Sequence, residues 1–321
     1  MNTELTEKEI KFTLFFEERG KSPELQETNS KVNKMDRALV YLKDKFLSKE
    51  EAQISVMDLS VLRGVGIFDY VRTYKTIPFH LEDHLLRLEA SADKISIILP
   101  RPIEEIASLV RTLIDKANFS ETSVRIVVTG GASLDQFMPT EQSELILIAY
   151  PFSPYPEVYY EKGISVSTTN FSRFFPTCKT THYLPAILAL REAKKKGAVD
   201  ILYTDREKGV LEGSTSNFFA FKSGTLVTPS ENILEGITRK IVLHLAKKIF
   251  PIEVRPIALS EIPSFDAAFF TSSNREVMSI VKIDAHVVGD GKIHPNVSIL
   301  AQTFSAYTAS FSEQDLQSSF K

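Results

Sequence analysis

Residues 174–240 decide the fold, and they read FFPTCKTTHYLPAILALREAKKKGAVDILYTDREKGVLEGSTSNFFAFKSGTLVTPSENILEGITRK. This stretch contains three features in a fixed order. A single lysine, Lys179, lies between a proline turn and an apolar helix that we expect to begin near Tyr183. Glu212 then lies in a Gly-Ser-Thr-Ser-Asn turn between two expected strands, and residues 236–238, Gly-Ile-Thr, open another helix.

The three features suit the chemistry of one cofactor. A lysine that forms covalent bonds needs an apolar setting, in which its amine is neutral and nucleophilic near neutral pH. A carboxylate buried among small residues needs a cationic partner, and a protonated pyridine nitrogen is one. A Gly-Ile-Thr turn that leads into a helix offers free N–H groups and the positive end of a dipole, which suit a phosphate. Together they describe a pyridoxal phosphate site, although each alone is also found as a surface lysine, a turn glutamate or an ordinary helix start.

The order and spacing of these features resemble those of the class IV aminotransferases, the fold type IV group of pyridoxal phosphate enzymes. That group includes branched-chain aminotransferases, D-amino acid aminotransferases and aminodeoxychorismate lyases. Its pattern is a lysine followed by Asn-Tyr or similar, then Glu-Gly-x-x-x-Asn, then Gly-Ile-Thr-Arg. The chain has each part except the asparagine, whose place His182 takes. The resemblance implies a two-domain α/β (α+β) fold with pyridoxal 5'-phosphate as its cofactor.

Composition limits the other possibilities. The chain has 321 residues, of which 43% are hydrophobic and 25% charged, with a net charge of -3. This balance is typical of a globular protein and argues against nucleic acid or an anionic membrane surface as the main partner. The single cysteine, Cys178, excludes an internal disulfide, and we expect it to be a buried thiol. No apolar run reaches the ~18 residues of a membrane span, so we expect a cytoplasmic enzyme.

The chain divides into three parts by composition and pattern. Residues 1–34 are rich in charged and polar residues, and we expect a poorly ordered extension with one short helix over 5–18. Met35 is an alternative start. We expect a small N-terminal α/β domain over 35–155 and a larger C-terminal domain over 156–321 that carries the lysine. The boundary falls near 152–162, where prolines and tyrosines cluster.

The first half contains a second group of candidate residues. Residues 81–97 predict an amphipathic helix. Its apolar side is expected to contain Leu85, Leu86, Leu88 and Ile95. His80 and His84 are four residues apart, but no third ligand is visible, so we predict no metal site.

The resemblance continues in this half through GVGIFDYVR and HLLRL. Arg87 matches the arginine that binds the cofactor phosphate, a role that suits its planar, two-pronged guanidinium. Asp69 replaces the glutamate that is usual in the family. By the same resemblance Lys179 would hold the cofactor covalently and move a proton, and Glu212 would keep the pyridine nitrogen protonated. The remaining cofactor contacts implied are Tyr183 to the ring oxygen, Leu234 to a ring face, and Ile237, Thr238 and Ser273 to the phosphate.

Substrate choice depends on the group that binds the substrate carboxylate. The loop at 133–137 lacks the arginine and histidine of the well-known bacterial D-amino acid aminotransferases, and Phe-Asp-Tyr at 68–70 replaces the Phe-Glu-Gly of bacterial branched-chain enzymes. Residues 62–70 and 128–131 instead resemble a less common subgroup of D-amino acid transaminases, in which Arg63 and Arg125 would bind carboxylates. In the alternative, these arginines form structural ion pairs with Asp58, Asp69 or Asp135. Arg275 is a third cation near the expected phosphate edge.

Three functions remain open. The first is a transaminase acting on an amino acid and a 2-oxo acid such as 2-oxoglutarate, with D-amino acids ahead of branched-chain L-amino acids. The second is a lyase of the aminodeoxychorismate type, and the third a binding protein without catalysis, against which the retained Lys179 argues. The resemblance implies a homodimer, in which the loop of Arg63 would reach the neighbouring site.

Overall fold

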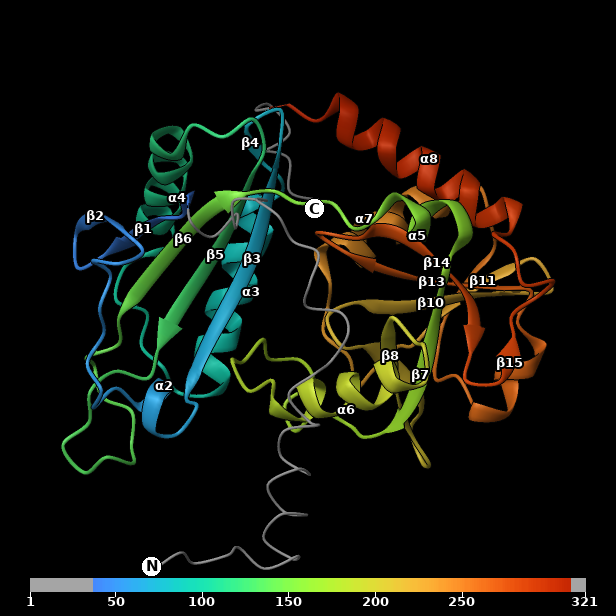
Figure 1. Ribbon diagram of the computed structural model, residues 1–321, viewed down its shortest axis with the longest axis horizontal. Helices are drawn as coiled ribbons and strands as arrows, with labels where there is room; N and C mark the ends of the chain where they lie inside the picture. The colour runs from blue at the N-terminus through green and yellow to red at the C-terminus, as the bar shows by residue number, and fades with distance from the viewer. Residues whose placement is uncertain (1–36, 313–321) are drawn as a thin grey trace, which may run out of the picture. The chain divides into compact units, whose positions relative to one another are not determined.

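The first of two sheets is antiparallel throughout and has the strand order β2-β1-β6-β5-β3-β4 (Figure 1). The computed structural model describes residues 37–312, so the predicted extension at 1–34, its helix at 5–18 and Met35 lie outside the described residues. The strands of this sheet are β1 (Leu39–Leu42), β2 (Lys45–Ser48), β3 (Gly66–Tyr74), β4 (Ile77–Pro78), β5 (Thr122–Thr129) and β6 (Leu145–Pro151). A single helical turn, α2 (Leu59–Leu62), precedes β3.

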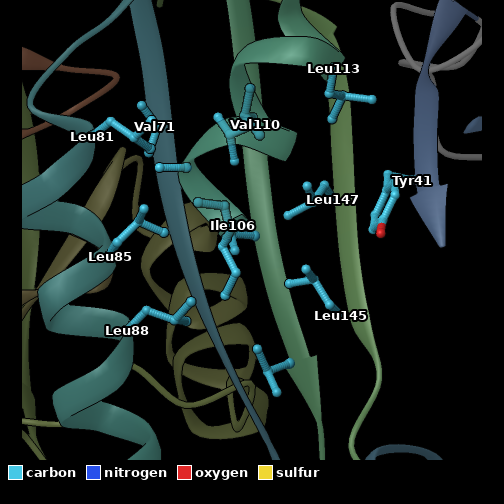
Figure 2. Packing of buried hydrophobic residues seen from close by; sticks show 14 of the residues in the cluster. Tyr41, Val71, Leu81, Leu85, Leu88, Ile106, Val110, Leu113, Leu145 and Leu147 are labelled. Atoms are coloured by element: carbon cyan, nitrogen blue, oxygen red, sulfur yellow. The ribbon is translucent and has the colours of Figure 1, made fainter. Parts of the chain in front are cut away.

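Two helices cover one face of this sheet, α3 (Leu81–Lys94) and α4 (Ile103–Ala117). Figure 2 shows Leu81, Leu85 and Leu88 of α3 packed toward Val71 of β3, with residues of α4 alongside. These leucines repeat at the helical period, so they share one face of α3. Burying such side chains stabilises the fold by ~1.5–3 kcal/mol each. The prediction for Leu86 is wrong, because one residue turns the helix by about 100° and leaves that side chain 49% exposed.

The opposite face of the sheet remains open, and the alternation of β-strands fixes which side chains it presents. Ile67, Val71 and Val124 point to the helices and are fully buried. The intervening residues Tyr70 on β3 and Arg125 on β5 lie directly opposite each other in the register and share the other face. This open face forms one wall of the candidate site.

The second sheet follows the order β12-β11-β10-β13-β14-β7-β8-β9. Its strands are β7 (Ile164–Asn170), β8 (Asp200–Asp205), β9 (Gly209–Gly213), β10 (Asn217–Lys222), β11 (Thr225–Thr228), β12 (Ile252–Val254), β13 (Ala267–Ser272), β14 (Glu276–Ile283) and, paired with β14, β15 (His286–Val287). A further pairing joins β9 to β10 through Glu212 and Asn217. The strands β13, β14, β7 and β8 pair in this order between β10 and β9. Together with the direct pairing of β9 and β10 they form a closed ring of six strands.

Both faces of this sheet are buried, and β10 shows why its sequence is continuously apolar. Phe218 and Ala220 pack inside the ring, whereas Phe219 and Phe221 pack against α7 (Ile237–Ala246) and α8 (Pro295–Ser310). A third layer is α6 (Leu184–Lys195), whose alanines pack on β8 and β9. The remaining short helices are α5 (Glu157–Lys162) and η2 (Leu259–Ser264). The mixture of antiparallel pairs with parallel pairs such as β7–β8 confirms the expected α/β (α+β) class.

Candidate active site

A cavity of about 550 Å³ lies between the open face of the first sheet and the ring of the second. Its lining draws on β3, β5 and β6, on the segment before α6, on the turn between β9 and β10, and on the first turn of α7. The sequence-predicted residues that it brings together are Arg87, Arg125, Lys179, Tyr183, Glu212, Leu234, Ile237, Thr238 and Ser273. Arg63 is not among the residues that line it.

Backbone hydrogen bonds fix the segment that carries Lys179. The Lys179 carbonyl accepts from the N–H of Phe68 at 2.9 Å, and the Thr181 N–H donates to the Gly66 carbonyl at 2.9 Å. The segment is therefore an extra strand-like partner of β3. On its other side the Lys179 N–H donates to the Ser91 hydroxyl of α3 at 3.2 Å. The lysine thus stands on a segment held by both the first sheet and its covering helix.

The Lys179 amine has the electrostatic setting of a nucleophile. Burial lowers its pKa to about 8, and the nearby positive charge of Arg87 acts in the same direction. The Nζ atom lies 4.7 Å from the centre of the Phe68 ring. A larger fraction of the amine is therefore neutral at neutral pH than for an exposed lysine, which is the form that attacks a carbonyl.

Glu212 is the penultimate residue of β9, so the prediction that it lies in the turn is wrong: the turn follows it, and strand pairing at the end of β9 leaves its side chain buried. Its Oε1 accepts from Nε and Nη2 of Arg173 at 2.9 and 2.7 Å. Its Oε2 accepts from the Leu234 N–H at 3.0 Å and from the Asn217 amide at 3.3 Å. Burial raises the Glu212 pKa, while the Arg173 charge opposes that rise. Because every one of these neighbours donates, the carboxylate is held as an acceptor.

Arg173 is the main site residue that sequence reasoning missed. Besides Glu212, its guanidinium donates to the carbonyls of Pro176 and Cys178, on the segment that leads to the lysine. One side chain therefore ties the carboxylate to the Lys179 segment. The available signal was weak: an arginine six residues before a candidate lysine, in a segment with no regular periodicity.

Another part of the cavity lining suits an anion. Arg87 reaches it from α3, and α7 begins there at Ile237 with Gly236 as its N-terminal cap. The first N–H groups of a helix have no carbonyl partner inside the helix, so those of Ile237 and Thr238 are available. A Cβ at position 236 would collide with the Asn217 side-chain oxygen. Only glycine therefore allows this close approach of the turn to β10.

Arg125 has no carboxylate in ion-pair range among residues 37–312. Its guanidinium lies 5.6 Å from the centre of the Phe68 ring and hydrogen-bonds to Tyr150, whose pKa is raised by burial and lowered by this contact. The alternative of structural ion pairs is wrong within the described chain, because the candidate acids have other partners. Asp69 binds Arg87, and Asp58 accepts from the hydroxyl of Thr129.

The remaining candidates lie outside the cavity lining. Arg63 is exposed and donates to its neighbour's carbonyl at 3.1 Å. Arg275 forms a buried ion pair with Asp200, so its charge is already neutralised within the protein. Cys178 is a fully buried free thiol, as predicted, and burial raises its pKa. His80 and His84 hydrogen-bond to Asp83 and Asp69 respectively.

The residues present fit pyridoxal phosphate. The cavity brings together an amine of lowered pKa, a buried carboxylate, and a helix start beside an arginine. These are the three groups that a carbonyl, a pyridine nitrogen and a phosphate require, and the volume lies in the usual range for a cofactor site.

No helix among residues 37–312 is long and apolar enough to cross a membrane.

Comparisons with known proteins agree with this geometry. Residues 66–283 match the family model for amino-transferase class IV. D-alanine aminotransferase of Staphylococcus haemolyticus is 30% identical over 279 residues, which cover 84% of this chain and 98% of that protein.

Two solved structures are also similar. The branched-chain aminotransferase of Thermoproteus uzoniensis, solved with norvaline, has a TM-score of 0.79 and 28% identity, covering 87% of this chain and 97% of its own. A branched-chain amino acid aminotransferase of Thermotoga maritima, described as putative by those who solved it, has a TM-score of 0.73 and 26% identity, covering 86% and 97%. The chain therefore belongs to the class IV aminotransferases, the pyridoxal phosphate enzymes that transfer an amino group between an amino acid and a 2-oxo acid.

Proposed function

We propose that Lys179 holds the cofactor and moves the proton at the substrate Cα. When bound, pyridoxal phosphate supplies an electron sink for the negative charge that develops at that carbon. The lowered pKa of the Lys179 amine supports both roles, since the same nitrogen must attack a carbonyl and accept a proton near neutral pH. Borohydride reduction followed by peptide mapping tests this assignment. A label on Lys179 is the expected result, and a label on another lysine would refute it.

The other roles concern the remaining residues of the cavity lining. Glu212 is proposed to keep the pyridine nitrogen protonated, with Arg173 holding the carboxylate ionised through two hydrogen bonds. Arg87, the first N–H groups of α7 and Ser273 are proposed to bind the phosphate. Tyr183, whose ring packs edge-on against Phe68 at 5.6 Å between centroids, is proposed to contact the ring oxygen. Leu234 is proposed to cover one face of the cofactor ring.

The proposed substrate class rests on Arg125. Arg125 is an exposed arginine that lines the active-site cavity and has no carboxylate partner in the described chain, so its guanidinium is available to an external anion. We therefore propose that Arg125 binds a substrate carboxylate, with a dicarboxylic 2-oxo acid such as 2-oxoglutarate as the acceptor. The D-alanine aminotransferase relative favours a D-amino acid donor. Branched-chain L-amino acids are the second candidate, favoured by the two solved structures of branched-chain enzymes.

Parallel assays separate these candidates. The donors are D-alanine and L-leucine, each with 2-oxoglutarate, and aminodeoxychorismate is offered alone as a lyase substrate. We expect the highest kcat/KM for D-alanine. A higher kcat/KM for L-leucine would refute the proposal of a D-amino acid donor. Release of product from aminodeoxychorismate without a 2-oxo acid would refute the proposal that the reaction needs a 2-oxo acid acceptor.

We propose a homodimer as the working unit. Apolar side chains are exposed on α2 and the loop before it, on the loop after β5, on residues 174–175 and on α6, all toward the lower edge in Figure 1. The most exposed are Val56, Leu134, Phe137, Phe174 and Leu184. A second cavity of about 380 Å³ is lined by residues 64–66, which follow α2, by Pro139, by residues 174–175 and by the start of α6, and it shares Arg173, Tyr183 and Ser214 with the first.

Exposed apolar surface next to a site is a common mark of a protein interface. A second chain seated there would also bring the exposed Arg63 toward a site. Light scattering on an active sample tests the dimer, and a mass equal to one chain would refute it. The cytoplasmic location and the boundary at 155 between two domains remain predictions.

A further inference from the structure

Arg87 gives most of its hydrogen-bonding capacity to the protein itself. A guanidinium has five N–H groups. Its Nε donates to Asp69 at 2.9 Å, Nη2 donates to Asp69 at 2.8 Å, and Nη1 donates to the Glu235 carbonyl at 3.1 Å. Within the described chain this leaves one N–H on each terminal nitrogen for the cavity. Two N–H groups of one planar fork suit two oxygens of one phosphate.

The Asp69 carboxylate is itself immobilised. It lies on β3 with no exposed surface. Besides Arg87, its Oδ1 accepts from the Tyr70 N–H at 2.7 Å and from Nδ1 of His84 at 2.7 Å. All of its partners are donors, so the carboxylate is ionised and cannot rotate without losing a charge-assisted hydrogen bond.

His84 completes the group from the helix that carries Arg87. It is one turn before Arg87 on α3 and is 1% exposed. Because an ionised carboxylate only accepts, Nδ1 must carry the hydrogen. The approach of the Arg87 Nη2 to the same nitrogen at 3.3 Å is therefore not a hydrogen bond. Burial lowers the His84 pKa, so the ring is neutral and the three side chains carry no net charge.

We propose that Asp69 and His84 are positioning residues that hold Arg87 in register with the cofactor phosphate, an inference that rests on the proposed function. The neutral sum of charges means that this subsite recognises the phosphate by the direction of two N–H groups rather than by excess positive charge. An aspartate suits this role because it is anchored on the strand that also pairs with the Lys179 segment. The Arg87 guanidinium and the Lys179 segment are then both held by one strand, β3.

Two variants of the full-length protein, stripped of cofactor, test the proposal, and a third serves as a rescue. Asp69→Asn removes the bidentate acceptor but keeps the side-chain size. His84→Ala removes the N–H that fixes Asp69, whereas His84→Asn restores a donor at the position of Nδ1. The dissociation constants for pyridoxal phosphate and for pyridoxal, which lacks the phosphate, are measured by absorbance titration for each protein.

The ratio of the two constants is the decisive quantity. Asp69→Asn should weaken pyridoxal phosphate binding ~10- to 100-fold, as expected for the loss of an oriented charge-assisted contact. His84→Ala should weaken it ~10-fold, and His84→Asn should return it to within ~3-fold of the parent. Pyridoxal binding should change less than ~2-fold in all three, and the ³¹P resonance of the bound phosphate should shift and broaden in Asp69→Asn.

Glu82→Gln is a matched control. Glu82 lies on the same helix and accepts from Arg111 of α4 at 2.6 Å, whereas the acceptor of Arg87 is Asp69. It should leave the ratio of the two constants unchanged. If Asp69→Asn lowers the melting temperature but leaves that ratio unchanged, or binds pyridoxal phosphate more tightly, the positioning role is refuted while Lys179 labelling still supports the proposed function. A parent protein that does not prefer pyridoxal phosphate to pyridoxal would refute both.

Discussion

Replacing Lys179 with methionine should stabilise the cofactor-free protein at neutral pH, and the gain should shrink in alkali. The folded environment lowers the lysine pKa from 10.5 to about 8, with burial as the main cause. Each pKa unit corresponds to ~1.36 kcal/mol, so the folded protein bears a cost of at most about 3 kcal/mol when the amine is charged. The amine faces the cavity, where water reduces this cost, and we expect about 2 kcal/mol.

The sign of the pH dependence follows from proton counting. Below pH 8 both the folded and the unfolded chain hold the proton, and the full cost is present. Between pH 8 and 10.5 the unfolded chain holds a proton that the folded chain has lost, so the stability of the parent rises with pH. The methionine variant lacks this rise. Their difference in free energy of unfolding should therefore shrink by about 2 kcal/mol across that window.

Urea unfolding of both proteins at intervals from pH 7 to 10.5 measures the difference. Groups that titrate in both proteins cancel, and the apolar gain of methionine adds only a constant. Lys195→Met is the control, because that lysine is 70% exposed and its charge therefore carries no cost of burial. If the difference in free energy of unfolding between the parent and Lys179→Met does not change with pH, the pKa of the Lys179 amine is not lowered by the fold. That result would remove the physical basis of the proposed nucleophile.

Three further predictions concern the rest of the cavity. Glu212→Gln should retain the cofactor but reduce kcat ~100-fold or more, since a neutral amide cannot stabilise a pyridinium; a near-parental kcat would leave Glu212 a structural residue. Arg173→Met should lower the free energy of unfolding of the cofactor-free protein by ~3 kcal/mol, because it leaves the Glu212 carboxylate buried without its cation; equal stability in urea would contradict this. Arg125→Met should raise the KM for 2-oxoglutarate ~30-fold or more while the bound cofactor spectrum stays unchanged; an unchanged KM would place the carboxylate contact elsewhere.

The cofactor end of the site could be predicted because its parts are consecutive in the chain. Lys179, Glu212 and the start of α7 each belong to a local motif, and all of them line one cavity. Local chemistry made each of them a candidate, and their order and spacing, which resemble those of the family, pointed to one site. The fold was needed to show that these motifs face one another.

The substrate end was less predictable, because strand alternation decides it and a single sequence does not show which face of a strand is open. Tyr70, Arg125 and Tyr150 share the open face only because β3, β5 and β6 pair in a particular register. Arg275 illustrates the opposite outcome. Its position suggested a free cation, but Asp200, on a strand far away in the sequence, neutralises it in the interior.

Arg173 was missed for a further physical reason. Its importance depends on the closure of the ring of strands, where β9 and β10 pair only through Glu212 and Asn217. Closure buries the Glu212 carboxylate at the seam, and a buried carboxylate requires donors from outside its own strand. Arg173 supplies two of them and also binds the backbone that leads to Lys179. The pairing of β9 with β10 therefore buries a carboxylate that requires a cation, and Arg173 is that cation. Because this pairing depends on the closed ring of strands, no local motif in the sequence around Arg173 indicates its role.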